Sequence, residues 1–187
     1  SLADARITGV DNENYTGAEP GLSINAAGNA REYRYTNSVV LNSTALAKAN
    51  QNNLIYFLGN NDVSPKTLTI GIDGNENSTT MANPIGTYGP YHLVGYGNFD
   101  ITGAFPGDIM EIIWYNNSLT SNESDKINSY LALKNGTTFN KNYISSSNTT
   151  FWNATSNSAY HNNVLGIGRD MNGALNQKIA KSCNNGS

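Results

Sequence analysis

The sequence predicts an all-β fold, an antiparallel jelly-roll sandwich with one short helix toward its C-terminal end, at about residues 121–134. Two observations lead to this prediction. Short runs rich in β-branched and aromatic residues recur along the chain, and Gly, Pro, Asn and Asp separate them roughly every ten residues. Only one stretch has helical spacing over a useful length, which argues against a parallel α/β fold.

Six runs in the first hundred residues either alternate apolar and polar residues or are largely apolar, which is typical of strands. They are the segments 5–10, 21–26, 31–36, 54–59, 66–72 and 91–99. Segment 66–72 is expected to pair with 54–59 as a hairpin. The Ala-rich residues 45–49 have helix propensity but are few, so we expect a loop there with one helical turn.

A strand is the next prediction, because Ile109–Tyr115 is a run of β-branched and aromatic residues. Gly107 bounds this run on one side and Asn116 on the other. Its apolar residues stand at both odd and even positions, so we expect both faces of the strand to be covered.

A capped helix follows this run directly. Thr120 is placed as the N-cap, and Glu123 stands three residues later, at the spacing of a capping box. Asn135 and Gly136 provide a left-handed stop. The apolar residues at helical spacing are expected to form one buried stripe, composed of Ile127, Tyr130 and Leu131.

A resemblance to a known family lies in an ordered set of short segments. They are GDIMEIIWYN, INSYLALKNGTT, NYISS, FWNAT, NNVLGIGRD and LNQKIAKS. In this order they resemble a pairing in large secreted surface proteins of Bacteroidota, of the gliding and adhesin type. There a concanavalin A-like (laminin G-like) jelly roll ends in a strand and a short helix, and a second β-rich module follows. The resemblance covers roughly the second half of the chain.

The resemblance implies two domains, a jelly roll over residues 1–137 and the start of a second β-rich module over 138–187. It further implies a location at the cell surface, but it names no ligand. Together with the low charge and the lack of a catalytic set, it leads us to expect a secreted, non-catalytic adhesion module, which binds a carbohydrate or a cell-surface partner or acts as a spacer. Other domains of the same long polypeptide would be its neighbours. Two alternatives stay open, a structural filament or shell subunit and a glycoside hydrolase-like jelly roll.

The composition excludes some partners. Charged residues make up 13% of the chain, against about 25% in an ordinary soluble domain. The formal net charge of −3 argues against binding to nucleic acid or to an anionic membrane surface. No stretch approaches the ~20 apolar residues of a membrane helix, so no membrane insertion is expected. The single cysteine, Cys183, makes no internal disulfide, and the chain ends suggest a fragment of a longer polypeptide.

Catalysis by paired carboxylates is disfavoured. Asp108 and Glu111 reproduce part of the Glu-x-Asp-x-x-Glu pattern of some jelly-roll glycoside hydrolases, but Pro106 stands where the nucleophile belongs. On a regular strand the two carboxylates would also point to opposite faces. The two histidines, His92 and His161, lie far apart in the sequence and have no carboxylate at a metal-ligand spacing. We therefore expect no enzyme and no transition-metal site.

Calcium is the one cofactor that the sequence leaves open. Asp73–Asn77 offers hard oxygen ligands, and Asp62 and Asp100 add others. The order of ligands in an EF-hand is absent, and polar turns of this kind are also common hairpin tips.

Carbohydrate binding is the ligand class that the aromatic and amide content favours. The chain has 11 Tyr and 2 Trp among many Asn residues. A tyrosine or tryptophan combines an apolar ring with a polar tip, which suits stacking on a sugar and also suits a sandwich core. The candidates stand in Gly-rich or polar stretches and are Tyr88, Tyr91, Tyr96 and Trp152.

Overall fold

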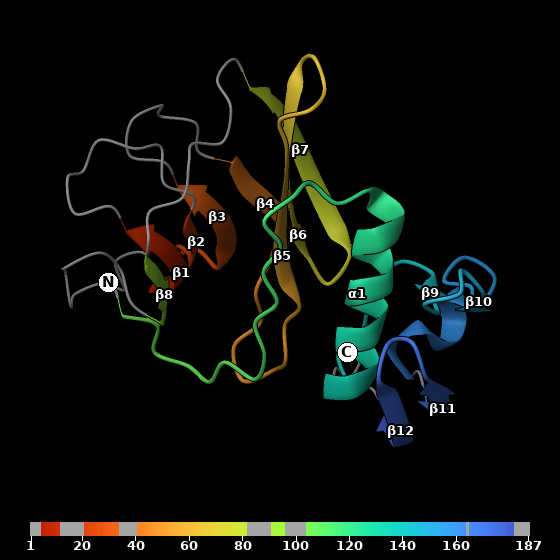
Figure 1. Cartoon of the computed structure of the whole chain (residues 1–187). Coiled ribbons are helices and arrows are strands. Elements are labelled where there is room, and N and C mark those ends of the chain that lie inside the picture. Colours follow the sequence, from red (N-terminus) through yellow and green to blue (C-terminus); the bar gives the residue numbers. More distant parts are fainter. Residues whose placement is uncertain are drawn as a thin grey trace. The chain divides into compact units, whose positions relative to one another are not determined.

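The computed structural model describes residues 5–11, 21–33, 41–81, 91–95, 104–163 and 165–181. The chain divides into two compact units. The first comprises Ser1–Ala47 and Ile55–Ser118, and the second comprises Lys48–Leu54 and Leu119–Ser187. The described residues form antiparallel strands and a single α-helix, which confirms the predicted all-β class (Figure 1).

The larger sheet of the first unit has five strands in the order β4-β3-β2-β1-β8. Every neighbouring pair is antiparallel. The strands are β1 (Ala5–Asp11), β2 (Gly21–Ile24), β3 (Asn29–Tyr33), β4 (Leu41–Leu46) and β8 (Tyr91–Val94). Strands β1 to β4 form a meander, and β8 pairs with the edge of β1 that does not face β2. Segments 5–10, 21–26, 31–36 and 91–99 were each predicted as strands, and each overlaps one.

The smaller sheet has the order β5-β6-β7, with β5 (Ile55–Asn60), β6 (Lys66–Ile72) and β7 (Asn75–Met81). This confirms the predicted hairpin between 54–59 and 66–72. A two-residue turn joins β6 to β7, and its two residues have positive φ angles, 52° at Asp73 and 87° at Gly74. That conformation belongs to the tight hairpin turns that favour Asp-Gly.

The two sheets of the first unit face each other, because β4 packs on β6 and β7 (Figure 1). One apolar core lies between them. Its buried members are Leu22, Ala30, Leu41, Leu68, Ile70, Ile72 and Met81, and Ile55 and Phe57 of β5 pack against it. This packing makes the first unit a two-layer β structure.

Strand β4 corrects the prediction of a loop with a helical turn at 45–49, since residues 41–46 are extended. Leu41 and Ser43 are buried, and Asn42 and Thr44 between them are exposed. The Ser43 hydroxyl accepts a hydrogen bond of 2.9 Å from the Ala30 amide of β3. Pairing with a neighbouring strand thus outweighs the helix propensity of a few alanines.

Segment 109–115 corrects the second prediction, because it has no regular secondary structure and belongs to no sheet. None of the described strands pairs with it. Its composition favours the extended backbone, but a strand also needs a hydrogen-bonded neighbour, which composition does not supply. The expectation that both of its faces are covered is likewise wrong.

The predicted helix is confirmed as α1 (Ser121–Asn135). The Glu123 amide donates to the Thr120 hydroxyl at 3.3 Å, and the Thr120 amide donates to Glu123 Oε2 at 2.8 Å. These two bonds form the predicted capping box. Gly136 closes the helix with φ 65° and donates its amide to the Ala132 carbonyl, as a left-handed C-cap does.

The buried face of α1 differs from the predicted apolar stripe. Its buried residues are Ser124, Asn128, Ser129 and Ala132, whereas Ile127, Tyr130 and Leu131 are only half-buried. Small polar side chains tolerate this burial because they are hydrogen-bonded. Asn128 Nδ2 donates to Ser124 Oγ at 3.2 Å, and Ser129 Oγ donates to the Asp125 carbonyl at 2.6 Å.

The rest of the second unit consists of short pairs of strands. β9 (Tyr143–Ile144) pairs with β10 (Thr150–Trp152), and β11 (Leu165–Asp170) pairs with β12 (Leu175–Lys181). A 3-10 helix, η2 (Ser158–Asn163), lies between the two pairs in sequence. The structure groups α1 with these elements, whereas the sequence placed the domain boundary at 137/138, after the helix.

Helix α1 has 15 residues and is too short and polar to cross a bilayer, and no helix in the described part of the chain meets that requirement.

Candidate functional site

Segment 109–115 exposes apolar side chains on the first unit. The exposed fractions are 63% for Met110, 37% for Ile112, 39% for Ile113 and 45% for Tyr115. Scattered exposed apolar residues are ordinary, but four within six consecutive positions of a segment without a sheet partner make it the candidate interaction site of the first unit. We refer to 109–115 as the extended segment.

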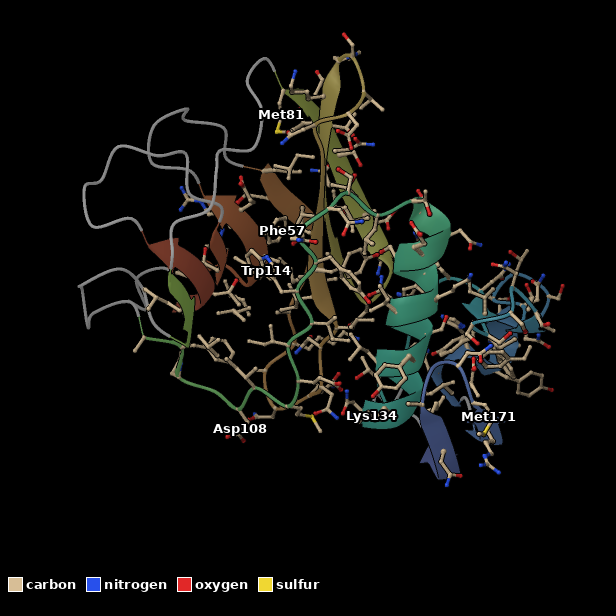
Figure 2. The ribbon with its side chains drawn as sticks, viewed as in Figure 1. Phe57, Met81, Asp108, Trp114, Lys134 and Met171 are labelled. Carbon is tan, nitrogen blue, oxygen red and sulfur yellow. The ribbon has the colours of Figure 1, made fainter. Side chains whose placement is uncertain are left out.

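Two contacts fix the extended segment to the first unit. Trp114 meets Phe57 of β5 edge to face, with ring centroids 6.0 Å apart (Figure 2). Ile109 Cδ1 lies 3.9 Å from the point that a Cβ on Gly95 would occupy, just beyond the end of β8. Phe57 itself packs against the core between the sheets. The extended segment is therefore anchored through Trp114 while its neighbours remain exposed.

The carboxylates considered for catalysis both lie in or beside the extended segment. Asp108 is exposed and Glu111 is half-buried. In the described residues no group of three or more His, Cys, Asp and Glu side chains comes together as a metal site. Asp73 lies in the tight β6–β7 turn, and residues 75–77 continue as strand β7. The turn geometry thus accounts for the Asp73-Gly74 pair, and calcium binding remains a prediction.

A run of aromatic rings is the main feature of the second unit. Phe139 and Tyr143 are fully buried, with centroids 5.8 Å apart, and Phe151 tilts against Tyr143 at 6.1 Å. The Tyr143 hydroxyl accepts from the Phe139 amide at 2.8 Å. Phe151 is 50% exposed. The run therefore leads from the core of this unit to its surface.

A slip in the β9–β10 pairing produces this placement of Phe151. Thr150 stands opposite Ile144, and Trp152 stands opposite Tyr143, so Phe151 is the extra residue of a bulge. Bulges re-aim a side chain relative to the regular alternation of a strand. Sequence reasoning singled out Trp152 and missed Phe151. Neighbouring residues of a strand face opposite sides, so the Phe-Trp pair already indicated that one ring would lie outward.

Trp152 is half-buried in β10, and its Nε1 is buried without an acceptor among the described residues. His161 of η2 is also half-buried, and neither ring nitrogen has a hydrogen bond of good geometry there. Burial lowers the pKa of His161 below its ordinary value of 6.5, and the nearby Phe139 backbone only partly offsets this shift. The imidazole is therefore uncharged at neutral pH.

The other predicted sugar-binding residues belong to the first part of the chain. Tyr88 and Tyr96 lie outside the described residues. Tyr91 begins β8, where its backbone stands opposite Asp11 of β1, but its side chain is not among those described. Tyr91 and Trp152 fall in different compact units. Sugar binding by these residues remains a prediction.

A group of hydrogen bonds around Asp170 joins two turns of the second unit. Ser146 donates to the Asp170 carboxylate from its amide at 2.7 Å and from its hydroxyl at 2.5 Å. The Gly173 amide adds a third bond of 3.1 Å. These donors, those of Ser146 above all, lower the pKa of Asp170. Asp170 thereby connects the β9–β10 turn to the β11–β12 turn in a structural role.

Comparison with known proteins adds one similarity. A family model described as a domain of unknown function (DUF8202) matches residues 123–187. The match begins within α1 and continues through the second unit. No curated protein and no solved structure matches the chain. The similarity thus concerns the second unit together with its helix and assigns no activity.

Proposed function

We propose that the chain is a non-catalytic adhesion module of a secreted cell-surface protein. The observation that supports this best is the extended segment, in which Met110, Ile112, Ile113 and Tyr115 expose apolar side chains on a chain with few charges. An extended backbone with exposed apolar side chains is suited to contact a partner by strand addition, because main-chain hydrogen bonds and alternate side chains then both contribute.

We also propose that the first unit is a jelly roll of the concanavalin A-like type. The two facing antiparallel sheets support this fold. So does the position of the extended segment, which contacts the edge strand β5 through Trp114 and Phe57.

Retention of the purified chain on intact Bacteroidota cells and on isolated cell-wall material tests the adhesion role. We expect the wild-type chain to be retained and Ile113→Lys to be lost into the wash, since a charge in the apolar surface opposes its burial. Val63→Lys is the matched control, because Val63 is 41% exposed in the β5–β6 loop of the same unit. Equal retention of both variants would refute the role of the extended segment. Without any retention, only a spacer role would remain.

A structural filament subunit is the second candidate, and the open side of β5 favours it. β5 is an edge of the smaller sheet in the described structure. Exposed edges of this kind template pairing between copies. Analytical ultracentrifugation at increasing concentration should then show a growing series of polymers, and a Lys placed on the edge strand β5 should abolish it. A concentration-independent monomer would eliminate this candidate.

A further inference from the structure

The surface of the second unit lacks charge over a long stretch. From Asn142 to Gly168 the sequence contains no Asp, Glu, Lys or Arg. His161, which lies in this stretch, is kept neutral by burial, since its pKa is lowered. Apart from Ala159, the exposed residues of the described part carry amides, hydroxyls or aromatic rings. Such a surface offers hydrogen bonds and apolar contact without attracting ions.

Phe151 presents a fixed ring on this surface. Its inner side rests on Tyr143, which is 1% exposed, and Tyr143 rests in turn on the fully buried Phe139. The hydroxyl of Tyr143 is bonded to the Phe139 amide. A ring supported in this way loses little freedom when a ligand stacks on it, which lowers the entropic cost of binding.

Tyr160 belongs to the same hydrogen-bonded loop and is 68% exposed. Asn153 Oδ1 accepts from the Ser156 amide at 2.9 Å, and Asn157 Nδ2 donates to the Asn153 carbonyl at 2.8 Å. The Tyr160 amide then donates to the Asn157 carbonyl. Asn142 Oδ1 ties the loop to β9 by accepting from the Ala154 amide at 2.9 Å. The loop between the two rings is therefore folded by its own asparagines.

We propose that this loop binds a neutral glycan, with Phe151 stacking on the apolar C–H face of a pyranose. The amides of the exposed Asn142 and Asn153 and the Tyr160 hydroxyl would bond to sugar hydroxyls. The inference rests on the proposed non-catalytic binding role and names a ligand class for it. Ligand sites commonly combine an apolar platform with a few polar groups that fix orientation.

The chemistry of the surface favours a glycan over other ligands. Phosphates and nucleic acids need cations, and this stretch has none. A stable protein interface buries more than about 1,000 Å² around a dense apolar centre. Single rings among amides and hydroxyls instead match a ligand that alternates C–H faces with hydroxyl groups.

Calorimetric titration of the full chain with cellohexaose and mannohexaose tests the proposal, with polygalacturonate as a charged probe. We expect binding of at least one neutral oligosaccharide and none of polygalacturonate. Phe151→Ala should weaken that binding by about tenfold, whereas Phe151→Tyr should retain it because a ring remains. Met171→Ala is the matched control, because Met171 is 68% exposed in the β11–β12 turn of the same unit (Figure 2).

A second measurement keeps Phe151 in place, so a folding defect of the Phe151 variants does not affect it. Trp114→Phe leaves Trp152, the neighbour of Phe151, as the one tryptophan, and its fluorescence should change during the titration. Absence of binding to both neutral probes, undiminished binding by Phe151→Ala, or equal binding of polygalacturonate would overturn the glycan site. Ile113→Lys should leave these affinities unchanged, so failure of the glycan site and failure of adhesion through the extended segment are separate results.

Discussion

Trp114 meets Phe57 edge to face, with the ring planes 78° apart, and so joins a segment without a sheet partner to an edge strand of the first unit. We expect this pair to couple energetically. A double-mutant cycle with Trp114→Ala and Phe57→Ala should give a coupling of about 0.5–1.5 kcal/mol, the usual value of such aromatic pairs. Urea unfolding followed by circular dichroism measures it. Strictly additive losses would show that the contact contributes nothing.

Gly71 allows Tyr56 to lie across the β5–β6 pair. The two residues are opposite in register, and a Cβ at Gly71 would overlap the Tyr56 ring. The ring is held there by a 2.9 Å hydrogen bond from its hydroxyl to Glu76 Oε1. Gly71→Ala should therefore cost about 1–3 kcal/mol of unfolding free energy. When Gly71→Ala is made in a Tyr56→Ala chain, it should cost much less, because the ring that it would overlap is gone. If Gly71→Ala costs as much there as in the wild type, the overlap with Tyr56 is not the cause.

Ser129 connects α1 to β9 in the second unit. Its buried hydroxyl accepts a 3.0 Å hydrogen bond from the Ile144 amide and donates to the Asp125 carbonyl. Ser129→Ala leaves the Ile144 amide without that acceptor and should destabilise the chain by about 1–3 kcal/mol. Ser121→Ala, at the exposed start of the same helix, should change stability little. Thermal unfolding of both variants compares them, and equal melting temperatures would contradict the role of Ser129.

His161 should make stability decrease as pH falls through 6.5, the ordinary pKa of its imidazole. Its pKa is lower in the folded chain than its ordinary value of 6.5. The unfolded chain therefore takes up a proton first as pH falls, and the stabilisation, complete above pH 6.5, declines as pH drops toward the folded pKa. His161→Gln should flatten this part of the stability profile relative to the wild type. Identical profiles would show that the ring stays solvated.

The two carboxylates with lowered pKa values affect stability in a different pH range from His161. Asp170 is stabilised as a carboxylate by Ser146, and Glu123 by Thr120. Such groups contribute stability above their unfolded pKa and lose it as pH falls through their lower folded pKa. The loss begins near pH 4.5, the ordinary pKa of Glu123, and continues toward lower pH, so it starts below the ordinary pKa of His161.

The sequence determined the elements whose hydrogen bonds are local. The capping box of Thr120 and Glu123 and the left-handed Gly136 closed α1 as predicted. The Asp73–Gly74 turn likewise joins adjacent strands through two residues. In each case the donors and acceptors stand within a few positions along the chain, so the pattern of residues contains the whole interaction.

Tertiary structure decided the features that depend on distant partners. Segment 109–115 has strand composition but no ladder neighbour, and β4 became a strand because β3 supplied one. The buried face of α1 includes Ser129, whose hydroxyl accepts a hydrogen bond from the Ile144 amide, 15 residues away. Phe151 reached the surface through a slip of pairing against Tyr143. Propensity and periodicity describe what a segment prefers locally, but the partner across a sheet or beneath a helix exists only once the chain has folded.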